Sequence, residues 1–199
     1  RLFPDVPNTT DRNAPAQGST PIAPARASVS RALQALSSLD WTSLVALADE
    51  QAKVGSRALS RDAYEVALWR LSEAPAEGDG REHPGSRAAA LTRWIARSFQ
   101  VDGRHDEALD CVDASEAIAL ANDDQIAFGH AVNVRAIIHW QRGDLSEAQR
   151  LYSQCLDIAL RESDTMLAAM AAQNLGIVAT VRGDHDQALH HFKASLQGY

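Results

Sequence analysis

Three glycines, Gly103, Gly143 and Gly183, stand forty residues apart in this sequence of 199 residues. Each opens a similar phrase: an alanine follows after five residues, a large apolar residue after nine and a small residue after twelve, and another small residue stands seven before. In the order of the copies these residues are Ala108, Ala148 and Ala188; Val112, Tyr152 and Phe192; Ser115, Cys155 and Ser195; and Ala96, Ala136 and Gly176. Agreement at so many registers predicts an internal structural repeat.

The segments between the glycines predict α-helices, because their apolar residues recur at helical spacing. Small residues at fixed registers let two antiparallel helices approach closely, and a glycine ends the first helix of each pair in a left-handed cap. Asp144 and Asp184 are expected to cap the second helices, with Glu147 and Gln187 completing capping boxes. The helices are expected at about 86–101, 105–121, 124–141, 145–161, 164–181 and 185–198.

A weaker copy precedes these three. It ends its first helix at Gly55, with Asp40 as the expected cap of a helix that begins at Trp41. Tyr64 and Ala67 then fall nine and twelve residues after the glycine, and Ser60 takes the place of the alanine. The repeats are therefore expected at about 41–72, 86–121, 124–161 and 164–198, within a repeat domain that covers 29–199.

Two segments interrupt the helical pattern. Five of the seven prolines lie in residues 1–28, which predicts an extended tail or linker. The turn-rich segment 73–85 accounts for the longer interval of forty-eight residues between Gly55 and Gly103. A further short helix is expected at 30–39, and the proline-rich tail is a candidate ligand for a groove of its own or a neighbouring molecule.

The phrase Asn174-Leu175-Gly176, followed by Gly183-Asp184 to Ala188 with Phe192, resembles tetratricopeptide repeats. The resemblance covers 86–199 well and 40–72 loosely. It implies an all-α fold, a right-handed superhelix of antiparallel helix pairs. The sequence departs from the family in its forty-residue period, which is similar to the long repeats of bacterial regulatory proteins, and in three sets of residues. Thr92, Val132 and Ala172 replace the family's tryptophan, Leu120 and Leu160 replace its closing proline, and Arg135 stands at the register of Leu175.

The resemblance also implies a concave wall that is built from the first helix of each pair. Counting back from each glycine places nine residues on this wall: Arg93, Arg97, Gln100, Asn133, Ile137, Trp140, Gln173, Asn174 and Ile177. Amides bond to the backbone of an extended peptide, and guanidinium groups suit a carboxylate. The alternative is that Trp94 and Trp140 are packing residues and that the amides are merely solvated.

The composition disfavours several function classes. A formal net charge of −7 lacks the basic surface that binds nucleic acid, and no apolar run approaches the roughly 20 residues that span a bilayer. We therefore expect neither nucleic acid nor a membrane as a partner. Cys111 and Cys155 make no disulfide framework, which favours a reducing, cytoplasmic setting with both thiols in or near the core.

No catalytic set, phosphate-binding loop or metal site is recognisable in the sequence, so we expect no enzyme activity, no cofactor and no metal. His185 and His190 are five residues apart, which does not place two ligands on one helical face. Arg-Gly-Asp occurs at 142–144 and again at 182–184. Its recurrence at one register identifies it as the turn within each pair rather than an adhesion signal.

The favoured function is a protein-interaction module that binds a peptide or a partner domain in its concave groove. The alternative is a regulatory or sensory segment of a larger bacterial signalling enzyme or transcription regulator. The first residue is Arg1 rather than Met, and the sequence stops at Tyr199 directly after a second helix. We therefore expect a longer parent protein, or self-association through an open C-terminal end near Phe192 and Leu196.

Overall fold

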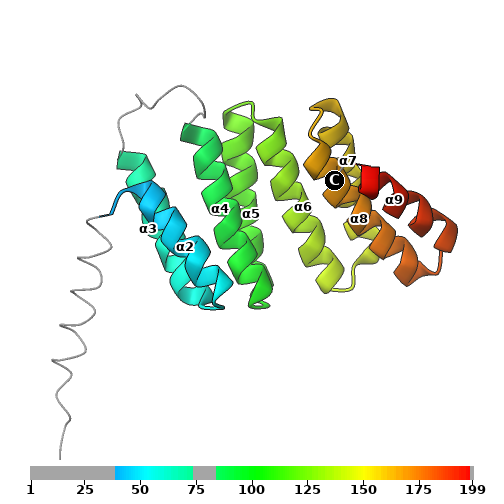
Figure 1. The fold of residues 1–199 in the computed structure, drawn as a ribbon, viewed down its shortest axis with the longest axis horizontal. Helices are drawn as coiled ribbons and strands as arrows, with labels where there is room; N and C mark the ends of the chain where they lie inside the picture. The colour runs from blue at the N-terminus through cyan, green and yellow to red at the C-terminus, as the bar shows by residue number, and fades with distance from the viewer. Residues whose placement is uncertain (1–38, 74–83, 198–199) are drawn as a thin grey trace, which may run out of the picture. The chain divides into compact units, whose positions relative to one another are not determined.

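A computed structural model of the chain describes residues 39–73 and 84–197, which form eight α-helices and no strand (Figure 1). The helices are α2 (Trp41–Lys53), α3 (Arg57–Glu73), α4 (Pro84–Val101), α5 (His105–Ala121), α6 (Gln125–Gln141), α7 (Leu145–Arg161), α8 (Thr165–Arg182) and α9 (His185–Gln197). The six helices of the three strong repeats begin and end within two residues of the expected positions. The tail 1–28, the helix expected at 30–39 (apart from Leu39) and most of the 73–85 segment lie outside the described residues.

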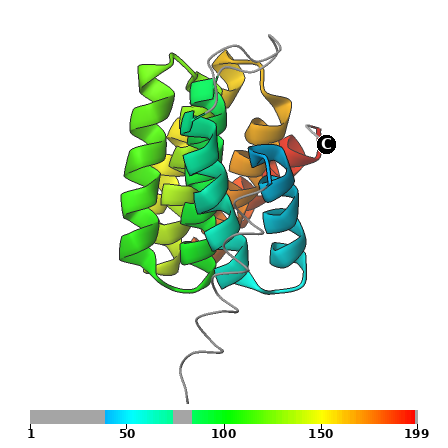
Figure 2. The same cartoon turned by 90° about the vertical axis from the view of Figure 1, so that its left-hand side faces the viewer.

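The helices form four consecutive pairs, α2/α3, α4/α5, α6/α7 and α8/α9, and the second helix of each of the first three pairs packs against the first helix of the next pair. Figure 2, turned by 90°, shows the later pairs behind the earlier ones. Contacts between α4 and α6, and between α6 and α8, bring first helices together on one side of the array. The fold is therefore an all-α solenoid in which the first helices form a common wall.

The repeat registers are packing positions, as expected. Ala108, Ala148 and Ala188 are all buried, and the first copy buries Ser60 at the same register. At the register seven residues before the glycine, Gly176 lies so close to Phe192 that a Cβ atom there would come within 2.6 Å of the ring. The small residues thus set how closely the two helices of a pair approach.

The glycines that end the first helices adopt the left-handed conformation that a side chain disfavours. Gly55, Gly103, Gly143 and Gly183 have φ between 74° and 83°. The turns between pairs also contain a residue with positive φ, at Asp123 (54°) and Ser163 (58°). These two residues are again forty apart, and the sequence patterns did not single them out.

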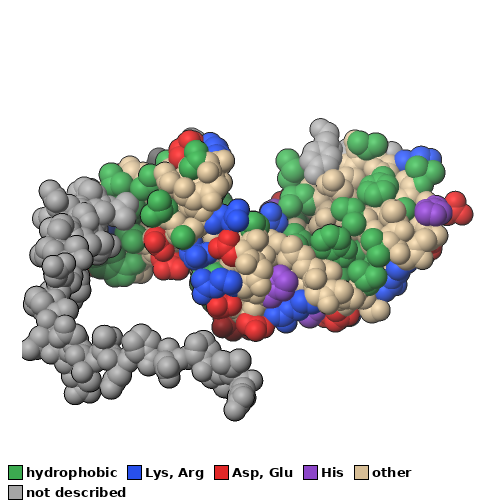
Figure 3. Space-filling view, turned by 90° about the horizontal axis from the view of Figure 1, so that it is seen from below, with side chains coloured by type: hydrophobic (Ala, Val, Ile, Leu, Met, Phe, Trp, Pro, Cys, Tyr) green, Lys and Arg blue, Asp and Glu red, His purple; other side chains and the backbone are tan. Residues whose placement is uncertain are grey.

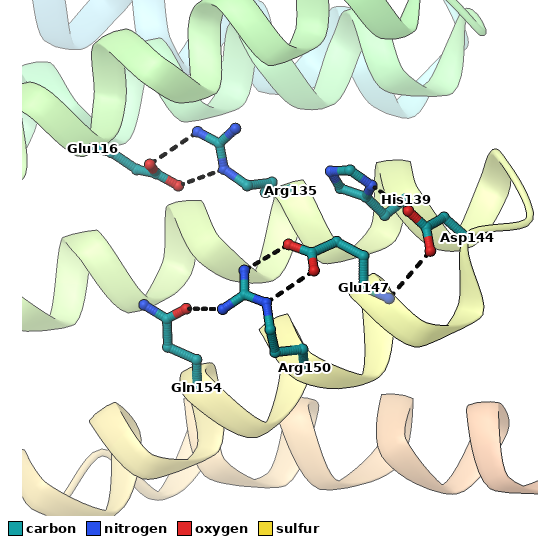
Figure 4. A network of polar contacts seen from close by, with 7 residues as sticks. All are labelled: Glu116, Arg135, His139, Asp144, Glu147, Arg150 and Gln154. Atoms are coloured by element: carbon teal, nitrogen blue, oxygen red, sulfur yellow. Dashed lines mark hydrogen bonds and ion pairs between the residues drawn. The ribbon is translucent and has the colours of Figure 1, made fainter.

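The helix caps are formed, but the capping boxes are only half formed. Asp144 accepts the backbone amide of Glu147 at 3.2 Å, and Asp184 accepts that of Gln187 at 3.1 Å. The Glu147 carboxylate, however, bonds Arg150 rather than turning back to the cap (Figure 4). The Asp144 amide donates to a carbonyl of the preceding helix instead, so the second half of the box is not needed.

The residue before each glycine ties a first helix to the start of the preceding second helix. Arg142 pairs with Asp106 at 2.5 Å, and Arg182 donates to Ser146 at 3.0 Å. Before Gly103 the acid and the base exchange places: Asp102 of α4 accepts from Arg57 of α3 at 2.6 Å and also from Arg61. Both copies of Arg-Gly-Asp therefore contain a structural contact between repeats.

Arg135, which departs from the family pattern, is accounted for by an ion pair. Its guanidinium donates to both carboxylate oxygens of Glu116 at 2.9 Å (Figure 4). It also donates to Asp113. These contacts join α6 to α5 at a half-buried position where the next repeat has Leu175. As expected, Cys155 is buried in the core and Cys111 packs at its edge.

Candidate functional site

The wall of first helices contains two cavities. The smaller has a volume of about 260 Å³ and is lined by residues of α4, α6, α7 and α8. Its lining residues are Arg97, Gln100, Val101, Ile137, Trp140, Tyr152, Asn174 and Ile177. Six of the nine residues that the sequence places on the wall therefore meet around one cavity. Figure 3 shows a hollow in the surface with basic side chains at its bottom and hydrophobic ones on its flanks.

Apolar walls and polar groups deep inside characterise the smaller cavity. Trp140 and Ile177 are 37% and 36% exposed, so both retain surface that a ligand can cover. Gln100 is only 5% exposed, and its Oε1 has no hydrogen-bond partner among the described residues. Burial raises the pKa of the Tyr152 phenol above its usual range, which keeps the hydroxyl a neutral donor. The cavity thus offers a buried acceptor, a hydroxyl and an amide beneath an apolar rim.

The larger cavity, of about 520 Å³, lies between α2, α4 and α6. Trp41, Trp94, Arg93 and His130 are among its lining residues, and of these only Arg93 was expected at the site. The Arg93 guanidinium lies over the Trp94 ring, 6.0 Å from its centre. Burial, followed by the charge of Arg97, lowers the pKa of Arg93 to about 10. Burial, followed by the charge of Arg93, lowers the pKa of His130 to about 4, so this imidazole is neutral at pH 7.

Arg93 and Arg97 differ from the other arginines of the repeats. Neither makes a hydrogen bond or an ion pair with any residue of the described ranges, whereas most arginines elsewhere pair with a carboxylate, and Arg161 and Arg182 donate to other oxygens. They stand one turn apart on α4, one at each cavity. Two neighbouring guanidiniums without an ion-pair partner give this part of the groove local positive charge, although Asp124 also lines the larger cavity.

Two of the expected wall residues do not face a cavity. Asn133 is 2% exposed, and its Oδ1 accepts a hydrogen bond of 3.0 Å from Asn174 Nδ2. The expectation that Asn133 is open to a ligand is therefore wrong, because the packing of α8 against α6 covers it. Gln173 is exposed on α8 and lines neither cavity.

Several lining residues were missed from the sequence. Tyr152 was assigned to packing from its register, and it both packs and reaches the smaller cavity. His130 lies three residues before Asn133, one turn from the expected wall, so an extension of the same count would have found it. Trp41 belongs to α2, the first helix of the weaker copy, for which no wall residues were derived.

Stacked antiparallel helix pairs with a shared wall of first helices define an α-helical repeat protein. In the described residues, no helix is both long and apolar enough to cross a bilayer. The model of the tetratricopeptide repeat family matches residues 127–199.

Solved structures share the fold at low sequence identity. The Rap conjugation gene regulator of plasmid pLS20, solved in complex with the Phr* peptide, is 19% identical with a TM-score of 0.65 over 77% of this chain. BtubC from P. vanneervenii is 22% identical with a TM-score of 0.63, and the match covers 90% of this chain and 74% of BtubC. MamA is 14% identical with a TM-score of 0.53, and the match covers 79% of this chain and 77% of MamA. This chain spans 41% of the length of the Rap regulator, and no curated protein matches its sequence.

Proposed function

We propose that this chain is a protein-interaction module that binds an extended peptide segment of a partner along the wall of α4, α6 and α8. The observation that carries the proposal is the smaller cavity, where six of the wall residues expected from the sequence meet. Its unpartnered Gln100 Oε1 and the Asn174 amide suit the backbone of a peptide, and its apolar rim suits a side chain. The proposed role is binding without catalysis, in the cytoplasm.

The Rap structure supports a peptide as the class of ligand, because that protein was solved with the Phr* peptide. The two chains share the fold over 77% of this one. At 19% identity the likeness does not transfer the residues that bind, so the site on this chain rests on its own cavities.

A display library of random nonapeptides provides the test. The 199-residue chain should enrich a subset of peptides, and Ile177→Arg should abolish their binding, because the new side chain fills the smaller cavity. Leu160→Arg is the matched control, since Leu160 is 63% exposed on α7 and lies outside both cavities. Peptides that bind wild type and Ile177→Arg equally would refute the groove as the binding site.

A second candidate is a regulatory segment whose peptide ligand changes the activity of the rest of a larger protein. It is favoured by the Rap regulator, of which this chain spans 41%. The test is made in the full-length natural protein, where an enriched peptide should alter the output of the remaining domains in wild type but not in Ile177→Arg. An unchanged output would refute the regulatory role and leave the interaction module as the remaining candidate. Self-association near Phe192 and Leu196 stays a prediction, to be checked by the molar mass in solution.

A further inference from the structure

We infer that the groove binds an acidic side chain that lies between two bulky apolar residues of the extended peptide. This inference rests on the proposed function and adds to it the sequence pattern of the ligand. Arg93 and Arg97 would hold the carboxylate, the larger cavity would hold an aromatic residue and the smaller cavity an aliphatic one.

The charge of the groove supports an acidic ligand. Arg93 and Arg97 stand one turn apart on α4, and burial, followed by the charge of Arg97, lowers the pKa of Arg93. One carboxylate of the protein, that of Asp124, lines the larger cavity. It accepts the backbone amide of Ala127 at 2.8 Å as the cap of α6, and it makes no ion pair with Arg93. A carboxylate from a ligand would supply the missing counter-charge, with hydrogen bonds from two guanidiniums.

A second observation, independent of charge, points to a ligand at the same place. Gln100 lies one turn beyond Arg97 on α4 and is 5% exposed. Its Oε1 lacks a donor among the described residues, although a buried acceptor without a donor is destabilising. A backbone N–H of a peptide laid across the smaller cavity would provide that donor. Arg93, Arg97 and Gln100 thus follow one another along two turns of α4, and turning the buried Gln100 side chain toward the smaller cavity would bring its Oε1 to the ligand.

The spacing of the cavities sets the spacing of the ligand. On α4 the larger cavity is lined by residues from Ser86 to Trp94, and the smaller by residues from Arg97 to Val101. The midpoints of these two ranges of α4 are about nine residues apart, which is about 13 Å along a helix. An extended chain covers this distance in about four residues. Side chains at i, i+2 and i+4 of an extended chain point to the same side, so the carboxylate falls between two apolar residues.

The position of the arginines favours an acidic side chain over a free C-terminal carboxylate. Arg93 lines one cavity and Arg97 the other. A chain that ended between them would leave one of the two cavities empty. A side-chain carboxylate lets the peptide continue in both directions. The cavities differ in size as well, because about 520 Å³ suits an aromatic side chain and about 260 Å³ an aliphatic one. Each contains two aromatic residues, Trp41 and Trp94 in the larger and Trp140 and Tyr152 in the smaller.

The test uses the full chain and the random nonapeptide library, displayed once with a blocked and once with a free C-terminus. The enriched blocked peptides should carry Asp or Glu at the middle of a bulky-x-acid-x-bulky pattern. Replacing that acid by its amide should weaken binding about tenfold or more, and so should Arg93→Gln/Arg97→Gln. Arg150→Gln, an exposed charge removed from α7, is the matched control and should leave binding unchanged.

The outcomes separate this inference from the proposed function. One contrary result is that the peptides that no longer bind Ile177→Arg show no acidic preference, and another is that they bind Arg93→Gln/Arg97→Gln as well as wild type. Either result would overturn the acidic pattern while the groove would remain the binding site. A further contrary result is enrichment only from the library with free C-termini, with the recognised carboxylate at the chain end. That result would overturn the inference that the carboxylate comes from a side chain. No enrichment, or binding that Ile177→Arg does not reduce, would refute the proposed function itself. Circular dichroism melting of each variant confirms that it folds.

Discussion

Asn174 Nδ2 donates a hydrogen bond of 3.0 Å to Asn133 Oδ1, forty-one residues earlier in the chain. The bond joins α8 to α6 and holds the Asn174 amide at the edge of the smaller cavity. Asn133 is buried, so its acceptor is satisfied within the protein rather than by a ligand. The contact therefore links the stability of the repeat stack to the geometry of the site.

Asn133→Ala and Asn174→Ala test this contact. Each should lower the free energy of unfolding, Asn133→Ala by about 1–3 kcal/mol because it also opens a small cavity. The double variant should lose less than the sum of the singles, with a coupling on the order of 1 kcal/mol. Urea denaturation measures all three. Exposed Gln173→Ala should change stability by less than about 0.5 kcal/mol. Strict additivity of the two asparagine variants would contradict the contact.

Gly176→Ala should destabilise the protein, although alanine favours a helix by about 1 kcal/mol over glycine. The new Cβ would meet three ring atoms of Phe192 at 2.6 to 2.9 Å, and a ring packed on the helix cannot yield easily. We expect a loss of about 1–3 kcal/mol. Gly176→Ala in a Phe192→Leu background is the matched control, because the ring is then absent, and it should be near neutral by thermal melting. An equal loss in the two backgrounds would show that the ring contact is not limiting.

Arg93→Gln should raise the stability of the ligand-free protein by about 1 kcal/mol. Burial and the charge of Arg97 lower the pKa of Arg93 to about 10, so at any pH below 10 the native state holds a charge that the unfolded state solvates better. Arg150→Gln, which removes an exposed pair with Glu147, should instead lower stability by less than about 0.5 kcal/mol. Chemical denaturation at pH 7 compares them. A destabilised Arg93→Gln would mean that the guanidinium is already satisfied.

Protonation of His130 should reduce stability in mild acid. Its pKa falls from 6.5 in the unfolded chain to about 4 in the fold, through burial and Arg93, which outweigh Asp124 and Asp164. The unfolded state therefore binds the proton first as the pH falls. The stability contributed by neutral His130 is complete above pH 6.5 and is lost progressively down to about pH 4.

Comparison of wild type with His130→Gln isolates this effect from that of the carboxylates. The difference between their free energies of unfolding should change by an amount on the order of 2 kcal/mol across this pH window. In Arg93→Gln the pKa of His130, followed by NMR titration, should move back toward 6.5. A difference that stays flat with pH would show that the imidazole is well solvated.

The fold was predictable from the sequence because its determinants are local and repeated. Helical spacing, Gly143 and Gly183 as helix ends, and the capping aspartates act over a few residues, and three copies reinforce the same interpretation. Even the weaker copy follows the rule, with Ser60 buried at the alanine register. The half-formed capping box was not predictable, because Arg150 competes for Glu147 one turn away.

Counting along the helices was enough to name the wall residues, of which Arg97, Gln100, Ile137 and Ile177 share one cavity. Only the tertiary structure decided which wall residues remain open. Asn133 is buried because α8 packs against α6, and Arg93 and Arg97 lack a counter-ion because no carboxylate of a neighbouring helix reaches them. The sequence thus determined the period, the helices and the wall. The exposure and pairing of each wall residue depend on contacts between segments about forty residues apart, which the pattern within one helix does not contain.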